Sequence, residues 1–251
     1  GIQNILITDL TNSNPEELKV RQLETVTGIL QGKGLTDYAS LTPSVASNIS
    51  QKLEARVFIN GSIKQSGSVV RLNSQLIDSK TEETFKSFQI DGTSEKILSI
   101  VDSLSAMVKN FLVISKLANK VSPEIQQFVS SNSPEAYRYF IYGENAFRNT
   151  DPAAVQLFSQ AIALDSNFYY AAIRLLEVYW DWGFFEEGKK WCRRVYEKKD
   201  QMPMQLKLWA EVLYASFFKT PYERIKYLNK LLEIDDQSPY DYFRIGFAYV
   251  Q

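Results

Sequence analysis

The chain of 251 residues is long enough for two domains of ordinary size, and its composition, 45% hydrophobic and 23% charged, is that of a globular protein. Its 28 basic and 29 acidic side chains leave a net charge of -1, so no overall field attracts nucleic acid or an anionic membrane. The absence of histidine excludes the usual general base, His-dependent zinc sites and Ser-His-Asp triads. We therefore expect no metal or cofactor, and catalysis would need carboxylates or lysine.

The same composition bears on the compartment. Cys192 is the single cysteine, which allows no internal disulfide and indicates neither an oxidising nor a reducing compartment. No apolar run approaches the roughly 18 residues that span a bilayer, so we expect a soluble fragment without membrane insertion. The chain lacks an initial methionine and stops within a helical pattern, which favours a part of a longer protein, periplasmic or cytoplasmic.

The first 53 residues are predicted to form two strands that alternate with two helices. Ile5–Ile7 is a short apolar run typical of a buried strand, and Tyr38–Leu41 is expected to form another. Asn14-Pro15 and Thr42-Pro43 are helix starts, because a side-chain oxygen caps free amides while proline occupies the first helical position. The expected helices are Pro15–Gln31 and Pro43–Leu53.

A hairpin and a long helix complete the first domain. Arg56–Lys64 and Ser68–Asp78 are expected to pair across Gln65–Gly67, with polar and apolar residues alternating so that one face is wet. Thr84–Ile90 adds a strand, and Thr93 is expected to cap an amphipathic helix. The predicted fold is a small α+β sandwich, and the apolar stripe of its last helix comprises Ile97, Ile100, Val101, Leu104, Val108 and Phe111.

The hairpin carries a family resemblance. Its first strand ends in Gly61-Ser62, and its second strand ends in Leu76-Ile77-Asp78 before a Lys80-Thr81 turn. Residues 1–115 thereby resemble the amino-terminal α/β domain of TolB-like proteins, with Phe88 where that family has Trp. In bacterial signalling proteins this domain often precedes tetratricopeptide repeats.

The rest of the chain repeats a helical-hairpin signature three times, with a fourth copy ending at the last residue. The clearest copy spans Tyr169–Met202, and Gly143 and Gly246 supply the small first-helix residue in other copies. The period is roughly 34 residues, and residues 134–251 resemble tetratricopeptide repeats. Aromatic residues mark a second core, since 27 of the 33 Phe, Trp and Tyr follow Glu135. We expect residues 116–133 to form a helical linker.

The resemblance implies a concave groove lined by first-helix residues. One first-helix position is glutamate in each of the three units. The groove is therefore expected to be aromatic with acidic spots. It should accept an apolar peptide segment of basic or neutral character. Packing of these aromatics against neighbouring repeats or against the first domain is the alternative. The predicted partner-binding residues are Tyr137, Phe140, Glu144, Phe147, Arg148, Tyr170, Ile173, Glu177, Trp180, Asp181, Met204, Lys207, Glu211 and Tyr214.

These features favour a non-catalytic interaction or sensor module of a larger bacterial signalling or envelope protein, with a protein or peptide partner. Two other functions stay open: a carboxylate-dependent enzyme with an interdomain site, and an architectural module that dimerises through the α/β domain. Cys192 falls at a core position of its repeat, where a buried inert thiol is expected. The sequence does not identify the partner.

Overall fold

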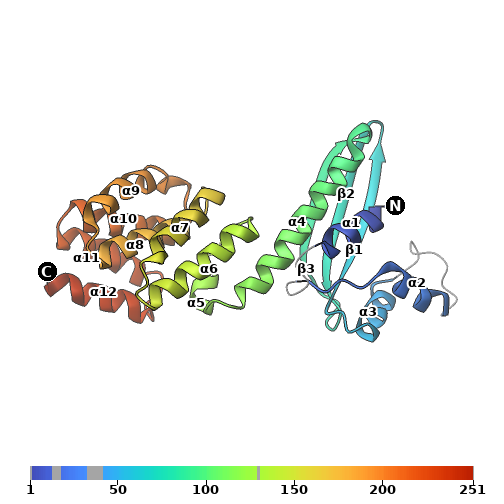
Figure 1. Cartoon of the computed structure of the whole chain (residues 1–251), viewed down its shortest axis with the longest axis horizontal. Coiled ribbons are helices and arrows are strands. Elements are labelled where there is room, and N and C mark those ends of the chain that lie inside the picture. The colour runs from blue at the N-terminus through green and yellow to red at the C-terminus, as the bar shows by residue number, and fades with distance from the viewer. Residues whose placement is uncertain (1, 13–17, 33–41, 129–130, 251) are drawn as a thin grey trace. The chain divides into compact units, whose positions relative to one another are not determined.

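The computed structural model describes residues 2–12, 18–32, 42–128 and 131–250. The chain divides into two compact units, Gly1–Lys116 and Leu117–Gln251. Its fold is mixed α+β and mostly helical, with a three-stranded antiparallel sheet in the first unit and helices alone in the described part of the second (Figure 1). The expected boundary near residue 115 agrees with this division, although residues 117–133 belong to the helical unit.

The sheet contains β1 (Val57–Ser66), β2 (Val69–Asp78) and β3 (Thr84–Thr93) in the order β1-β2-β3. Ser66 pairs with Val69, so the hairpin turn consists of Gly67 and Ser68 and lies slightly later than expected. Gly67 has a φ of 59°, which glycine adopts without steric cost. The predicted hairpin and third strand are confirmed.

One face of the sheet packs on α4 (Ile97–Ala118), which follows a 3-10 turn at Ser94–Lys96. Along β2 the alternate residues Val70, Leu72 and Leu76 are at most 2% exposed. They meet the predicted stripe of α4, which confirms both the alternation and the helical period. Thr93 occupies the N-cap position, but its side chain makes no capping hydrogen bond.

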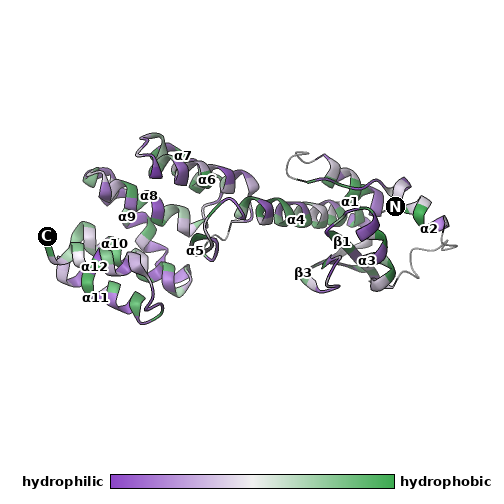
Figure 2. Ribbon diagram, turned by 90° about the horizontal axis from the view of Figure 1, so that it is seen from below, coloured by the Kyte–Doolittle hydropathy of each residue, from purple (hydrophilic) through white to green (hydrophobic). Residues whose placement is uncertain are grey.

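The segment Ser94–Ala118 corrects the expectation that no apolar run could span a bilayer, since it is long and apolar enough by length and composition. Figure 2 shows hydrophobic and hydrophilic residues alternating along α4. Its buried side is packed on the sheet, with Val101 1% and Val108 0% exposed. Only 33% of its most apolar 18-residue window is buried, so packing on the sheet accounts for part of the apolar composition of this helix.

Among the described residues before the sheet there are three short helices: α1 (Ile2–Thr11), α2 (Leu23–Gly32) and α3 (Pro43–Lys52). The predicted strand at residues 5–7 is wrong, because these residues lie within α1. The helix expected from residue 15 begins only at Leu23, and residues 18–22 are not helical. The third helix is confirmed, with Thr42 accepting a hydrogen bond from the Val45 amide. The strand expected at residues 38–41 lies outside the described residues.

In the described part of the second unit, a short α-helix precedes seven longer α-helices. Each longer helix from α6 to α12 packs against a sequence neighbour, and α10 also packs against α8 (Figure 1). The predicted helical pairs are therefore present. The bounds are α5 (Pro123–Gln126), α6 (Pro134–Arg148), α7 (Ala153–Leu164), α8 (Tyr169–Asp181), α9 (Phe185–Glu197), α10 (Met204–Phe218), α11 (Pro221–Leu232) and α12 (Pro239–Val250).

Small residues allow these helices to approach closely, as the repeat pattern predicts. A Cβ atom added at Gly143 would lie 2.8 Å from the ring of Phe158, and one at Gly188 would lie 2.5 Å from the ring of Phe217. Both glycines therefore sit at close helix contacts. At Gly246 such a Cβ would meet no atom within 4 Å, so the corresponding surface of α12 is open.

Candidate functional site

Five of the predicted groove residues are buried, so the expectation that they line an open surface is wrong for them. Tyr137, Phe140, Glu144 and Ile173 are at most 1% exposed, and Glu177 is 2% exposed. They lie on α6 and α8, between helices of the second unit. Their side chains stabilise the helical packing and are not accessible to a partner on this surface.

The aromatic groove positions contact rings of other helices, which is the alternative arrangement considered above. Tyr170 lies 5.6 Å from Phe140 between ring centroids, and Trp180 lies 5.3 Å from Phe217. Two further ring pairs complete the set: Tyr214 with Tyr196 at 4.0 Å and Phe147 with Trp182 at 5.8 Å.

The remaining predicted positions are more exposed. Arg148 and Met204 are exposed, Met204 by 66%. Lys207 donates to Asp200 at 2.6 Å, and the Tyr196 hydroxyl donates to Glu211 at 2.9 Å. The fourteen predicted residues therefore do not form one continuous surface.

A buried arginine explains why Glu144 and Glu177 can be buried. The Arg174 guanidinium on α8 donates from Nε to Glu144 Oε1 at 2.6 Å and from Nη2 to Glu144 Oε2 at 3.2 Å. Its Nη1 donates to Glu177. A buried carboxylate is costly unless it is paired and hydrogen-bonded, and Arg174 supplies both requirements for two carboxylates.

The pairing continues into the last helix. From α12, the Tyr240 hydroxyl donates to Glu177 at 2.7 Å, and Arg244 Nε donates to the Tyr240 oxygen at 2.9 Å. Arg244 also makes a bidentate ion pair with Asp181, at 2.9 and 3.2 Å. The network therefore joins α6, α8 and α12 and leaves no carboxylate of this group free for a basic partner segment.

Arg224 on α11 is the exception among the buried cations described above. It is 5% exposed, and its Nε and Nη2 atoms are buried without a hydrogen-bond partner. Its guanidinium lies between two rings, 5.7 Å from Trp180 and 5.9 Å from Phe247. Burial and the like charge of Arg244 lower the pKa of Arg224. Aromatic faces attract a cation, but they do not replace hydrogen-bond acceptors.

The outer side of α12 is unusually apolar for an exposed helix. Phe243 is 67% exposed and Phe247 45%, and their rings stack at 6.5 Å. Val250 is 86% exposed and extends this line at helical spacing, and we call Phe243, Phe247 and Val250 the α12 stripe. Exposed contiguous apolar patches mark interaction sites more often than scattered apolar residues do.

A buried acid lies on the same helix. Asp241 is 5% exposed, and its Oδ1 atom lacks a hydrogen-bond partner. Burial raises the pKa of Asp241. Unsatisfied polar atoms therefore occur on both α11 and α12.

Sequence reasoning missed Arg174, Arg224, Tyr240 and Arg244. One signal was present: Arg174 precedes Glu177 by three residues in an otherwise largely apolar helix, which predicts a side-chain pair. The partners on α12 follow Glu177 and Asp181 by 63 residues, so no local pattern indicates them.

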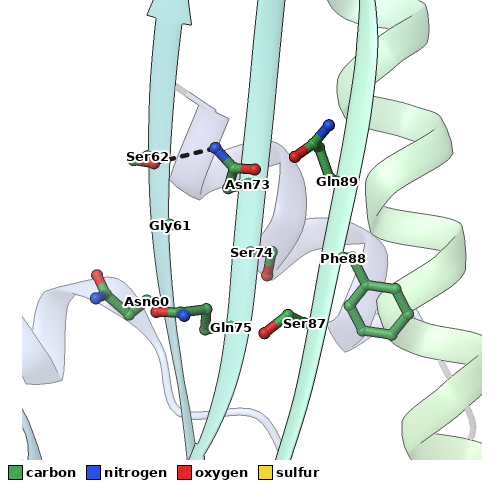
Figure 3. A pocket seen from close by; sticks show the side chains of 9 residues that line it. All are labelled: Asn60, Gly61, Ser62, Asn73, Ser74, Gln75, Ser87, Phe88 and Gln89. Carbon is green, nitrogen blue, oxygen red and sulfur yellow. Dashed lines mark hydrogen bonds between the residues drawn. The ribbon is translucent and has the colours of Figure 1, made fainter. Parts of the chain in front are cut away.

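The first unit has a polar surface of its own on the open face of the sheet. A hollow of about 390 Å³ lies over it, and Asn73 donates a long hydrogen bond to Ser62 at 3.5 Å (Figure 3). The side chains around the hollow are mostly neutral amides and hydroxyls, from Asn60, Ser62, Asn73, Gln75, Ser87 and Gln89.

A larger apolar cleft of about 880 Å³ follows β1, which is an edge strand, and is bordered by α1 and α3. Leu6 and Leu10 line it from α1, and Ile49 and Leu53 line it from the segment of α3. Neither this cleft nor the polar hollow contains a predicted site residue.

Cys192 is 1% exposed, and burial raises the pKa of its thiol to about 12. The thiolate is the reactive form of cysteine, so this residue is inert near neutral pH. The expected core position is confirmed.

No protein-family model matches the chain, and a search of curated proteins finds no significant match.

Proposed function

We propose that the chain is a non-catalytic protein-binding module of a larger bacterial signalling or envelope protein. In this proposal the helical unit is a solenoid of tetratricopeptide type and the first unit is a TolB-like α/β domain. The consecutive helical pairs and their close glycine contacts support the first assignment. The hairpin, the Gly61-Ser62 pair within β1, the Leu76-Ile77-Asp78 end of β2 and the covering helix support the second.

The exposed α12 stripe carries the proposal of a binding function. Its three residues are between 45% and 86% exposed and lie along one side of a single helix. Burial of apolar surface contributes roughly 25 cal/mol per Å², and aromatic residues dominate the energetics of many interfaces. The stripe therefore replaces the buried groove positions as the candidate contact surface.

Selection of helical peptides tests the binding function directly. An amphipathic peptide library would be selected on the immobilised chain, and the affinity of the best peptides measured by calorimetry. A variant carrying both Phe243→Glu and Phe247→Glu should lose about tenfold or more in affinity, because a charge then occupies the apolar contact. Leu164→Glu is the matched control, because Leu164 is 51% exposed at the end of α7 and lies outside the stripe.

Circular dichroism of each variant checks that the helices remain. Failure to select any peptide would contradict the proposed binding function. Equal loss in the control would show that the contact lies outside the stripe.

A further inference from the structure

One side of α10 stays accessible although the helices before and after it, α9 and α11, both pack against α10. It bears Glu211, Tyr214 and Phe218 at helical spacing, and all three are partly exposed. The Tyr214 ring lies 4.9 Å from Phe218 and 4.0 Å from Tyr196 of α9. Burial and the charge of Glu211 raise the pKa of Tyr227, so this residue of α11 is also close. We call these five side chains, with the cations beside their rings, the α10 face.

Two of the cations lie on the α9 side of this face. The guanidinium of Arg193 lies 5.0 Å from the ring centroid of Phe218. The ammonium of Lys199, in the 3-10 turn Lys199–Gln201, lies 4.0 Å from the ring centroid of Tyr196. Aromatic rings attract cations, so the rings hold these positive charges on the face.

The other two cations lie on the α11 side. The ammonium groups of Lys226 and Lys230 lie 6.0 and 5.7 Å from the Tyr227 ring centroid. Both lysines are exposed, as is Arg193 on the other side. Among the described residues, none of the four cations forms an ion pair with a carboxylate.

The acids near these cations already have partners. Glu211 accepts a hydrogen bond from the Tyr196 hydroxyl at 2.9 Å. Nearby, Lys207 donates to Asp200 at 2.6 Å, and Glu223 belongs to the capping box at the start of α11. The α10 face therefore has four unpaired positive charges around one hydrogen-bonded carboxylate, although the whole chain has a net charge of -1.

We propose that the α10 face binds an acidic segment of a protein partner. Carboxylates of the segment pair with Arg193, Lys226 and Lys230, and its apolar side chains pack on the rings, since complementary charge and buried aromatic surface give an interface its specificity and affinity. This contact is separate from the α12 stripe and goes beyond the proposed function. It reverses the preference expected from the sequence, which was for a segment of basic or neutral character.

A peptide suits this face better than a single-stranded nucleic acid does. Proteins bind single strands by stacking the bases on open aromatic rings along a positive groove. Here, cations already lie over the rings of Tyr196, Phe218 and Tyr227. Glu211 also places a negative charge among them, which a continuous phosphate backbone cannot avoid. A peptide can place carboxylates at the cations and a neutral side chain at Glu211.

Labelled peptides test the charge preference of the intact chain. Each capped peptide alternates Leu and Phe with residues that are all Glu, all Gln or all Lys, and fluorescence anisotropy measures its affinity. The Glu peptide should bind about tenfold more tightly than the Gln peptide, and the Lys peptide most weakly. Added salt should weaken binding of the Glu peptide, because exposed ion pairs are screened.

Three outcomes of this measurement would overturn the inference. They are equal affinity for the Glu and Gln peptides, no binding of the Glu peptide, and tighter binding of a single-stranded oligouridine than of the Glu peptide.

Lysine variants assign the preference to the α10 face. The variant with Lys226→Gln and Lys230→Gln should bind the Glu peptide about fivefold more weakly and the Gln peptide unchanged. The matched control, with Lys80→Gln and Lys96→Gln, removes the same charge from exposed lysines of the first unit and should change the affinity by less than about twofold. An equal loss in the control would overturn the inference.

A gain of affinity provides the sharpest test, because a variant that only disturbs folding does not produce one. Glu211→Gln should bind the Glu peptide about threefold more tightly, since it removes the negative charge of the face while its amide oxygen still accepts from Tyr196. An unchanged or lower affinity would overturn the inference. The variant with Phe243→Ala and Phe247→Ala should keep the wild-type affinity for the Glu peptide. A loss there would place the acidic peptide on the α12 stripe, so that the proposed function stands and this inference fails.

Discussion

At the scale of single residues, the helical unit contains buried arginines in two different electrostatic situations. Arg174 is surrounded by acceptors, whereas two of the nitrogens of Arg224 have none. Local sequence indicates one of these partners, because Glu177 follows Arg174 by three residues, but it indicates neither the Glu144 contact of Arg174 nor the burial of Arg224. The two arginines differ because acidic side chains of neighbouring helices lie next to Arg174 and not next to the two unpaired nitrogens of Arg224. Arg174 is therefore expected to stabilise the helical unit more than Arg224 does.

Substitution of Arg174 tests the network. Arg174→Met should lower the free energy of unfolding by about 3 to 5 kcal/mol, because it leaves two carboxylates buried with a missing cation. The variant with both Arg174→Met and Glu144→Gln should recover part of this loss, since one of those charges is then removed. Urea titration at neutral pH, followed by tryptophan fluorescence, measures both. A loss below roughly 1 kcal/mol would mean that water compensates the carboxylates.

At the scale of elements, the sequence predicted the regular patterns and failed where a short run was ambiguous. The alternation along β2 and the long stripe of α4 both extend over many residues, so only one period fits each. Ile5–Ile7 is too short to distinguish a strand from a helix, and it lies within α1. The predicted helix start at Thr42-Pro43 is confirmed, and the same hydroxyl-proline pattern begins α6 at Ser133-Pro134 and α11 at Thr220-Pro221, where the hydroxyl oxygen accepts an amide hydrogen bond.

The candidate site was less predictable than its helices. Repeat spacing assigned Glu144 and Glu177 to the same rank in two units, but it could not show that Arg174 and Arg244 approach them. Burial of a charged side chain depends on contacts between residues far apart in the chain. The acidic groove was therefore predicted from the direction in which these glutamate side chains were expected to point. Their burial and pairing depend instead on tertiary packing.

Two glycines provide a matched test of helix contacts. Gly188→Ala should lower the free energy of unfolding by about 1 to 3 kcal/mol, because its Cβ would overlap the buried Phe217 ring. Gly246→Ala should instead stabilise the free chain by up to about 1 kcal/mol, because alanine favours helix and the site is open. Chemical denaturation of both variants measures the difference. Equal effects would show that α9 moves to accommodate the added methyl group.

At the scale of the whole molecule, the two units have separate cores. The sheet and α4 share one hydrophobic cluster, and α10 and α11 contribute another in the second unit. All four tryptophans lie between residues 180 and 209, so tryptophan fluorescence reports on the helical unit alone. This distribution allows the stability of each unit to be followed separately in the intact chain.

Leu76→Ala tests the independence of the units. Leu76 is 0% exposed in the sheet core, and its truncation should lower the stability of the first unit by about 2 to 5 kcal/mol. Hydrogen exchange of the β2 amides should accelerate, while the urea midpoint from tryptophan fluorescence should stay unchanged. A parallel fall in the fluorescence midpoint would show that the two units unfold together.

The ion pairs of Arg244 connect α12 to α8, with α9, α10 and α11 between them along the chain. Separation of α12 from α8 would remove the bidentate cation of Asp181 and a hydrogen-bond donor of the buried Glu177 at the same time. Local opening of α12 is therefore expected to be costly, because both acids would lose these partners together. Contacts with residues 63 positions away thus give α12 a resistance to local opening that its own sequence does not supply.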